Sequence, residues 1–329
     1  MSERVVILAP SWLGDAVMAL PAIADVRRAS PDATIAVAAR PSVAPLFAIV
    51  DGIDARITLT RSDHAALAGF DVALLLPNAF RAALAAWRAG IPERWGYRAD
   101  GRRLLLTRSV DRPAAPAHQV EYYQRLVAAL GFANGPAVPR LAVSDAARDA
   151  GAQLLAAAGW DGRTPLVALA PGAAYGGAKR WPPESFAALA GDLARDGVQT
   201  VMIGSAADAP VVRRVLAART GASAGAALLD LVGKTDLPAL AGVFVHCRTL
   251  VTNDSGAMHV AAAAGVPVTA VFGPTRDCDT RPVGDRHAVL THDVWCRPCM
   301  LRECPLDHRC LRSIAPSDVL ASARRTLDV

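Results

Sequence analysis

A polar turn near residue 254 has the composition of an anion-binding site. Residues 251–259 (Val-Thr-Asn-Asp-Ser-Gly-Ala-Met-His) lie between an apolar strand pattern and an alanine-rich helix pattern. The first N–H groups of such a helix have no partner within it and, with the helix dipole, favour a phosphate. Ser255 and Gly256 are therefore candidate phosphate ligands, and Asp254 could bind sugar hydroxyls or cap the helix. Taken alone, the same residues also fit an ordinary helix cap without a ligand.

Two other turns follow strand patterns in the same way. The apolar run 5–9 leads into Pro-Ser-Trp-Leu-Gly-Asp at 10–15, and the apolar run 166–170 leads into the glycine-rich stretch 171–182. Each half of the chain thus begins with a strand, a proline, a glycine turn and a helix. In open α/β sheets, ligands bind beyond the carboxyl ends of the strands, so we expect two such halves to bind a ligand in a cleft between them.

Asp15 and Lys179 are the charged residues in these two turns that are best suited to a role in chemistry. A carboxylate at the start of a helix, as expected for Asp15, can accept a proton from an attacking hydroxyl, although it could equally serve only the helix dipole. The chain has only two lysines, Lys179 and Lys234, among 35 basic residues. Where arginine is the default cation, a lysine in a glycine turn indicates a need for a compact ammonium, as in a diphosphate pocket.

Several common motifs of other enzyme classes are absent. Residues 172–179 approach a P-loop, but one residue separates Gly177 from Lys179, and Arg180 stands where Ser or Thr would bind magnesium. The chain has no G-x-G-x-x-G after its first strand, no H-E-x-x-H and no G-x-S-x-G. These absences argue against an NTPase, a dinucleotide oxidoreductase, a zincin and an α/β-hydrolase.

The elements that must position these turns alternate along the chain. Strand patterns occur near 4–9, 34–39, 55–60, 71–76, 166–170, 199–203, 249–252 and 267–272. Helix patterns occur near 16–29, 42–49, 79–89, 119–131, 145–158, 184–195, 208–219, 237–246, 257–264 and 316–328. This alternation predicts parallel sheets. The length of 329 residues suits two α/β domains, expected at 1–160 and 161–329 with a hinge at 161–165, and the closing helix is a candidate to pack back on the first domain.

Positive charge is concentrated in residues 81–112. The segment has eight arginines against three acidic residues, and this excess of five equals the formal net charge of the chain: Arg81, Arg88, Arg94, Arg98, Arg102, Arg103, Arg108 and Arg112. Nucleic acid, an anionic membrane surface and a phosphorylated substrate are candidate partners, and a solvated surface is the alternative. A phosphorylated substrate is favoured because no nucleic-acid-binding motif accompanies the arginines.

The sequence predicts a cytoplasmic protein. No apolar run approaches the roughly 20 residues of a membrane-spanning helix, and the short apolar run after Arg4 does not fit a signal peptide. Cytoplasmic cysteines are expected to be reduced. A cluster with spacing close to that of a zinc knuckle leaves both a structural zinc site and free or redox-labile thiols open: Cys296, Cys299, Cys304 and Cys310, with His308 among them.

Three segments together resemble the ADP-heptose:lipopolysaccharide heptosyltransferases. They are residues 10–15, 171–182 and 252–259, and their order and spacing span nearly the whole chain. Residues 76–81, followed by 89–92, resemble the members that add the second inner-core heptose. The resemblance implies an α/β protein of GT-B architecture, with two Rossmann-like parallel-sheet domains facing a central cleft. It also implies an inverting transfer of L-glycero-D-manno-heptose from ADP-heptose to the first heptose of the lipopolysaccharide inner core, with no metal or cofactor required.

The resemblance also implies roles for individual residues. Asp15 would deprotonate the acceptor hydroxyl, Lys179 would neutralise the donor diphosphate, and Asp254 would hold donor hydroxyls. Further donor-side residues would be Arg180, Ser255, Gly256, His259 and, near the adenosine, Lys234; acceptor-side residues would be Ser11, Trp12, Asn78, Arg81 and Arg98. His259 could equally be a packed, hydrogen-bonded histidine.

The implied acceptor is a phosphorylated heptosyl-Kdo2-lipid A, reached by peripheral contact with the inner face of the cytoplasmic membrane. Members of the family differ in the cysteine segment, so the resemblance implies that catalysis does not depend on it. Two alternatives stay open. One is a heptosyltransferase I or III, or another sugar-nucleotide enzyme of the same fold, and the other is a non-catalytic protein that binds polyanions or metals.

Overall fold

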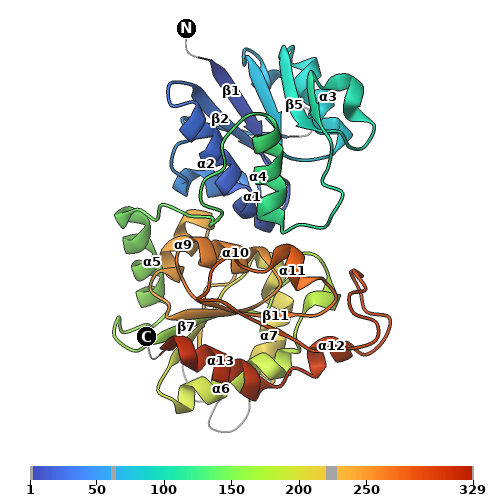
Figure 1. Ribbon diagram of the computed structural model, residues 1–329. Coiled ribbons are helices and arrows are strands. Elements are labelled where there is room, and N and C mark those ends of the chain that lie inside the picture. The colour runs from blue at the N-terminus through green and yellow to red at the C-terminus, as the bar shows by residue number, and fades with distance from the viewer. Residues whose placement is uncertain (1–2, 61–63, 220–227, 328–329) are drawn as a thin grey trace. The chain divides into compact units, whose positions relative to one another are not determined.

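In a computed structural model, the chain divides into two compact units, Met1–Ala142 and Val143–Val329. The structure describes residues 3–60, 64–219 and 228–327, so residue 328 of the expected closing helix lies outside the described part (Figure 1). Within these ranges, no helix combines the length and the apolar character needed to cross a membrane.

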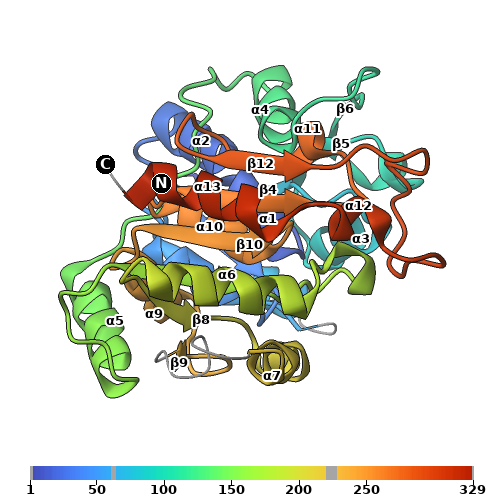
Figure 2. The ribbon, with the colours of Figure 1, turned by 90° about the horizontal axis from the view of Figure 1, so that it is seen from below.

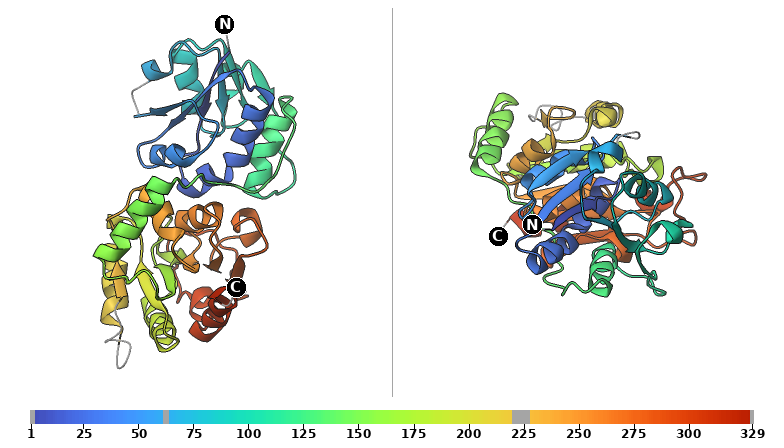
Figure 3. Two further views of the ribbon diagram at one scale, coloured as in Figure 1. Left: turned by 90° about the vertical axis from the view of Figure 1, so that its left-hand side faces the viewer. Right: turned by 90° about the horizontal axis from the view of Figure 1, so that it is seen from above.

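The first unit is built on a parallel sheet of six strands in the order β3-β2-β1-β4-β5-β6. Its strands are β1 (Arg4–Leu8), β2 (Thr34–Ala39), β3 (Ala55–Thr58), β4 (Val72–Leu75), β5 (Glu93–Tyr97) and β6 (Arg108–Val110). Its α-helices are α1 (Leu13–Met18), α2 (Leu20–Ala29), α3 (Phe80–Arg88) and α4 (Gln119–Ala129), and its 3₁₀ helices are η1 (Ala44–Ile49), η2 (His64–Leu67) and η3 (Arg102–Leu105). Helices α2 and α4 lie side by side (Figure 3).

The second unit repeats this strand order, as β12-β11-β10-β7-β8-β9. Its strands are β7 (Leu166–Ala170), β8 (Gln199–Met202), β9 (Leu228–Asp230), β10 (Thr249–Asn253), β11 (Val268–Phe272) and β12 (Ala288–Thr291). Its helices are α5 (Asp145–Ala157), η4 (Gly177–Lys179), α6 (Pro183–Arg195), η5 (Ala206–Asp208), α7 (Ala209–Ala217), α9 (Leu237–Phe244), α10 (Gly256–Ala263), α11 (Asp277–Thr280), α12 (Arg309–Arg312) and α13 (Pro316–Leu327). In both sheets the order is that of a Rossmann fold, which confirms the expected pair of parallel α/β sheets.

The strands at the centre of each sheet are nearly continuous apolar runs because helices cover both faces. All residues of β4, β7, β10 and β11 are buried. In the second unit, α6 and α13 share one apolar core with β7, β10 and β11 (Figure 2). Ser322 of α13 also shares a 3.0 Å hydrogen bond with Thr269 of β11. The closing helix, a candidate to pack on the first domain, therefore packs within the second unit.

The boundary expected between residues 160 and 161 is wrong, because α5 belongs to the second unit. Helix α5 packs on α9 at two glycines: a Cβ on Gly151 would overlap the backbone of Gly242, and one on Gly242 would overlap the Ala147 carbonyl. The expected hinge is a hydrogen-bonded turn inside the second unit, in which the Asp161 carboxylate accepts from the backbone N–H groups of Arg163 and Thr164 at 2.9 and 2.8 Å.

The helix expected at 16–29 is in fact two helices. Helix α1 ends at Met18, and α2 begins at Leu20 with a proline in its first turn. Since Pro21 has no N–H group, it fits the first turn of a new helix and cannot continue the preceding one. The segment expected as a helix at 42–49 is the 3₁₀ helix η1.

Candidate active site

The turns predicted to bind ligands follow the carboxyl ends of parallel strands, which lie at one edge of each sheet. In the second unit, residues 171–182 follow β7, Asp254 follows β10, and Thr275 lies three residues after β11. Strands β11, β10 and β7 are neighbours in the sheet, so these three turns are adjacent. The sheet order alone thus brings the two predicted donor-side turns together.

Lys179 and Asp254 form an ion pair between Nζ and Oδ2 at this edge, where their side chains are 13% and 5% exposed. The same carboxylate oxygen accepts a 2.7 Å hydrogen bond from Thr275 Oγ1. The Lys179 ammonium also lies 4.7 Å from the centre of the Tyr175 ring. Thr275 and Tyr175 are therefore additional residues of this cluster. The Gly-Pro-Thr turn after the 267–272 strand pattern was a sequence signal that could have indicated Thr275.

Asn253 fixes the Lys179 turn to strand β10. Its side chain is fully buried, and its Oδ1 accepts a 2.9 Å hydrogen bond from the backbone N–H of Trp181. Its Nδ2 donates to the Pro171 carbonyl at 2.8 Å. Asn253 thus holds both ends of the 171–181 turn, a structural role that its position in the motif did not reveal.

The interpretation of Asp254 or Ser255 as a simple helix cap is wrong for this turn. Ser255 occupies the N-cap position of α10, but within the described residues no side chain caps this helix. The Ser255 hydroxyl lies 3.1 Å from Thr252 Oγ1, and the Asp254 carboxylate contacts Lys179 and Thr275. His259, about one turn further along α10, is 6% exposed, as expected for a packed histidine.

Arg180 and Lys234 contact backbone carbonyls of their own surroundings. Arg180 Nη2 donates to the Ala173 carbonyl at 3.4 Å, while its Nε is buried without a hydrogen-bond partner among the described atoms. Lys234 Nζ donates to the Asp230 carbonyl at 2.7 Å. Its turn is joined to the turn after β8 by a 2.9 Å hydrogen bond from Gly233 N–H to the Gly204 carbonyl. Lys234 follows β9 and Lys179 follows β7, so both lie at the same edge of the sheet, two strands apart.

In the first unit, Asp15 lies in the first turn of α1, as predicted. Trp12 is the N-cap residue of this helix and is 48% exposed, and Ser11 precedes it. Tyr123 of α4 is close to the Asp15 carboxylate: burial raises the pKa of Tyr123, and the negative charge of Asp15 raises it further. Helices α1 and α4 are in contact, so the predicted base lies on a helix next to this buried tyrosine.

Asn78 lies after the adjacent strand β4, where its Nδ2 donates a 2.7 Å hydrogen bond to the hydroxyl of Tyr122. Its Oδ1 is buried without a hydrogen-bond partner among the described atoms. Tyr122, which contacts Asn78, is followed on α4 by Tyr123, whose pKa is raised by the charge of Asp15. Arg81 and Arg98 are exposed, and Arg98 pairs with Asp111 across 3.2 Å.

Three arginines of the basic segment 81–112 contact the protein itself, and the prediction that the segment faces an anion is wrong for the buried Arg102. Arg102 is fully buried and donates to the carbonyls of Tyr97 and Pro77, and burial lowers its pKa to about 10. Arg94 donates to the Leu105 carbonyl at 2.7 Å. Arg108 lies over the Trp95 ring, 4.7 Å from its centre. These guanidinium groups hold strands β5 and β6 and their loops together.

The four cysteines of the cluster lie near one another, but their side chains are not arranged to bind a metal ion. Burial raises the pKa of the Cys310 thiol, and the nearby thiols of Cys296, Cys304 and Cys299 raise it further. Across the described ranges, no three His, Cys, Asp or Glu side chains are placed to hold a metal ion. All four cysteines are free. As they are arranged, the described side chains do not form a structural zinc site, which was one of the two possibilities left open for this cluster.

Two Rossmann-ordered units with a lysine–carboxylate cluster beyond the strand ends fit a glycosyltransferase of GT-B type, and the comparisons identify the family. The model of Glycosyltransferase family 9 (heptosyltransferase) matches residues 64–309, and the chain belongs to this family. It is 31% identical over 309 residues to lipopolysaccharide heptosyltransferase 2 of Salmonella typhimurium, with 87% of each chain covered.

Two further comparisons agree with this assignment. The chain is 30% identical to lipooligosaccharide heptosyltransferase 2 of Haemophilus influenzae, over 87% of this chain and 88% of the relative. Its structure matches that of Escherichia coli ADP-heptose lipopolysaccharide heptosyltransferase II with a TM-score of 0.85 and 30% identity, over 98% of each chain. The family, fold and enzyme class predicted from the motifs are thus confirmed.

Proposed function

We propose that this glycosyltransferase is a heptosyltransferase II, which moves L-glycero-D-manno-heptose from ADP-heptose to the first heptose of the lipopolysaccharide inner core. The observation that carries the proposal is the buried Lys179–Asp254 pair beside the uncapped helix α10. An ammonium, a carboxylate and helix N–H groups at one edge of the sheet suit a nucleotide sugar, which has a diphosphate and several hydroxyls.

On the donor side, Lys179 would bind the diphosphate and Asp254 would accept hydrogen bonds from heptose hydroxyls. Thr275 keeps one oxygen of the Asp254 carboxylate engaged, so the carboxylate stays oriented when the ammonium turns to the phosphates. The N–H groups at the start of α10, at Gly256 and beyond, would share the phosphate charge. Together these groups stabilise the ADP that leaves.

On the acceptor side, Asp15 would take the proton from the attacking hydroxyl of the first heptose. The hydroxyl oxygen forms a bond to the anomeric carbon while the bond from that carbon to the diphosphate breaks, and ADP leaves with the electron pair. Attack from the face opposite ADP inverts the anomeric configuration. Ser11, Trp12, Asn78, Arg81 and Arg98 would line the acceptor side, with the exposed Arg81 and Arg98 toward acceptor phosphates.

The protein would act in the cytoplasm, at the inner face of the cytoplasmic membrane that holds the lipid A anchor of the acceptor. Calorimetric titration with ADP-heptose, ADP and UDP tests the donor side of the proposal. We expect ADP-heptose and ADP to bind and UDP to bind much more weakly. A protein that binds all polyanions alike would instead support the non-catalytic alternative.

The proposed transfer requires no metal, and we expect EDTA to leave the transfer rate unchanged. Lys179 and the helix N–H groups supply the positive potential that Mg²⁺ gives in other enzymes. The measurement is the initial rate with and without EDTA, together with a circular dichroism spectrum. Loss of activity with the fold intact, restored by Mg²⁺, would contradict the prediction.

A structural zinc ion at Cys296, Cys299, Cys304 and Cys310 is a separate proposal, and it requires the thiols to move closer together. Metal analysis of the purified protein tests it. One equivalent of zinc, with unfolding when EDTA removes it, would support the zinc site without involving metal in the transfer.

A further inference from the structure

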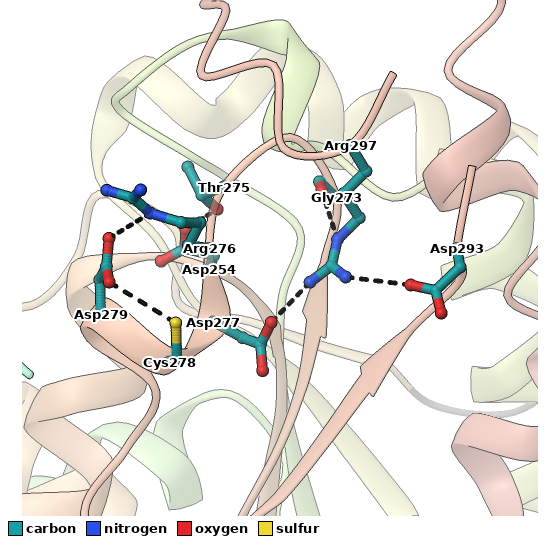
Figure 4. Close-up of polar contacts among 9 residues, drawn as sticks. All are labelled: Asp254, Gly273, Thr275, Arg276, Asp277, Cys278, Asp279, Asp293 and Arg297. Carbon is teal, nitrogen blue, oxygen red and sulfur yellow. Dashed lines mark hydrogen bonds and ion pairs between the residues drawn. The ribbon is translucent and has the colours of Figure 1, made fainter. Parts of the chain in front are cut away.

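The loop between β12 and α12, which contains Cys296, Cys299 and Cys304, is anchored beside the turn that carries Thr275. Arg297, whose side chain is 13% exposed, donates to the Gly273 carbonyl at 3.0 Å and to Asp277 Oδ1 at 2.7 Å, and it also pairs with Asp293 (Figure 4). The backbone N–H of Met300 donates to the Pro274 carbonyl at 2.9 Å. These contacts fix the loop to the residues that follow β11.

The next residues of the same loop contact the Lys179 turn. The Tyr175 hydroxyl donates to the Met300 carbonyl at 2.7 Å, and the Ala178 N–H donates to the Arg302 carbonyl at 2.9 Å. The Gly177 N–H donates to Glu303 Oε1, also at 2.9 Å. Residues 297–303, which we call the clamp segment, therefore connect the turn after β11 with the turn after β7.

Glycine is required at position 176 of the Lys179 turn because the backbone of the clamp segment approaches so closely. A Cβ on Gly176 would overlap the Arg302 carbonyl, and one on Gly177 would overlap the Glu303 carboxylate. The glycines at 176–177, which suggested a phosphate-binding loop, are therefore occupied by a contact within the protein. The N–H groups of Gly177 and Ala178 point at Glu303 and Arg302 rather than at a ligand.

We propose that Glu303 is a positioning residue for Lys179, and that the clamp segment sets the affinity of the donor site. By holding Gly177 and Ala178, it fixes the backbone directly before Lys179, and by holding Gly273 and Pro274 it fixes the backbone directly before Thr275. One segment thus holds the backbone next to both Lys179 and Thr275, the two partners of the Asp254 carboxylate. The inference rests on the proposed role of Lys179 at the donor diphosphate.

The test compares Glu303→Ala with Glu303→Gln, using ADP affinity by calorimetry and steady-state kinetics with ADP-heptose. Alanine removes the acceptor of the Gly177 N–H, whereas glutamine keeps a carbonyl oxygen there and removes only the charge. We expect Glu303→Ala to raise the Kd for ADP about three- to tenfold, as for the loss of one hydrogen bond. The KM for ADP-heptose should rise with it and kcat should change less, while Glu303→Gln should bind ADP at least as tightly as the wild type.

Asp307→Ala is the matched control, since this loop carboxylate contacts the Arg309 side chain and no other side chain of the described residues. It should leave the Kd unchanged. A second variant, Gly176→Ala, displaces the Arg302 backbone and should weaken ADP binding more than Glu303→Ala. Thermal unfolding of each variant shows whether the fold is retained.

A double variant separates this inference from the proposed function. If Glu303 acts through Lys179, Glu303→Ala should have little further effect in a Lys179→Ala background. Equal Kd values for Glu303→Ala and the wild type, or equal losses in the alanine and glutamine variants, would overturn the positioning role. An unchanged Kd in Lys179→Ala alone would instead overturn the donor site itself.

Discussion

Asp15→Asn is expected to lower kcat by roughly 10²–10⁴, the loss typical of removing a general base, while donor binding stays the same. The amide keeps the size of the carboxylate at the first turn of α1 but cannot take the proton of the acceptor hydroxyl. The measurement is the single-turnover rate with saturating ADP-heptose and acceptor, together with the calorimetric Kd for ADP-heptose.

Asp51→Asn is a suitable control for this variant, because Asp51 is an exposed carboxylate of the same unit. It should transfer heptose at the wild-type rate. If Asp15→Asn also keeps near wild-type turnover, Asp15 serves only the dipole of α1, and the base must be another group.

Lys179→Ala should weaken ADP-heptose binding and transfer together. A charge-assisted contact to a poorly hydrated diphosphate is worth about 1.5–3 kcal/mol, or roughly a 10- to 150-fold change in Kd. Lys179→Arg should restore only part of this loss, because the planar guanidinium does not fit the space of an ammonium between Tyr175 and Asp254. The measurements are calorimetric affinity and steady-state kinetics for both variants.

Removing Lys179 also leaves the Asp254 carboxylate, 5% exposed, without its cation, so thermal unfolding must be measured beside binding. Lys234→Ala is the comparison variant, since it removes the only other lysine, whose ammonium donates to a backbone carbonyl. A smaller loss of affinity is expected there. Full activity in Lys179→Ala would remove Lys179 from the site and leave the phosphates to Ser255 and Gly256.

The strands that support the candidate site could be predicted because they are buried on both faces. β1, β4, β7, β10 and β11 are apolar runs that end in turns rich in glycine, proline and asparagine. Strands β6, β9 and β12 were not predicted. They are edge strands of three or four residues, and such a short edge strand needs too little apolar sequence to give a recognisable pattern. Strand β5 was missed because two of its five residues, Glu93 and Arg94, are charged.

The residues that are candidates to bind the ligand could be predicted, but the residues that hold them in position could not. Local sequence indicates a lysine in a glycine turn and an aspartate before a helix, and parallel strand order brings them together. The contacts of Asn253, Thr275 and Glu303 join segments between 21 and 126 residues apart, and no local pattern encodes them. Likewise, charge counting cannot distinguish the buried Arg102 from the exposed Arg98.

The measurement that tests the central claim most directly is product analysis after incubation with ADP-heptose and two defined acceptors. One acceptor ends in the first inner-core heptose, and the other ends in Kdo. The account predicts that one heptose is added to the first acceptor with inverted anomeric configuration, and that the Kdo-terminated acceptor is not modified. Transfer to the Kdo-terminated acceptor, retention of configuration, or no transfer by a folded protein that binds ADP-heptose would contradict it.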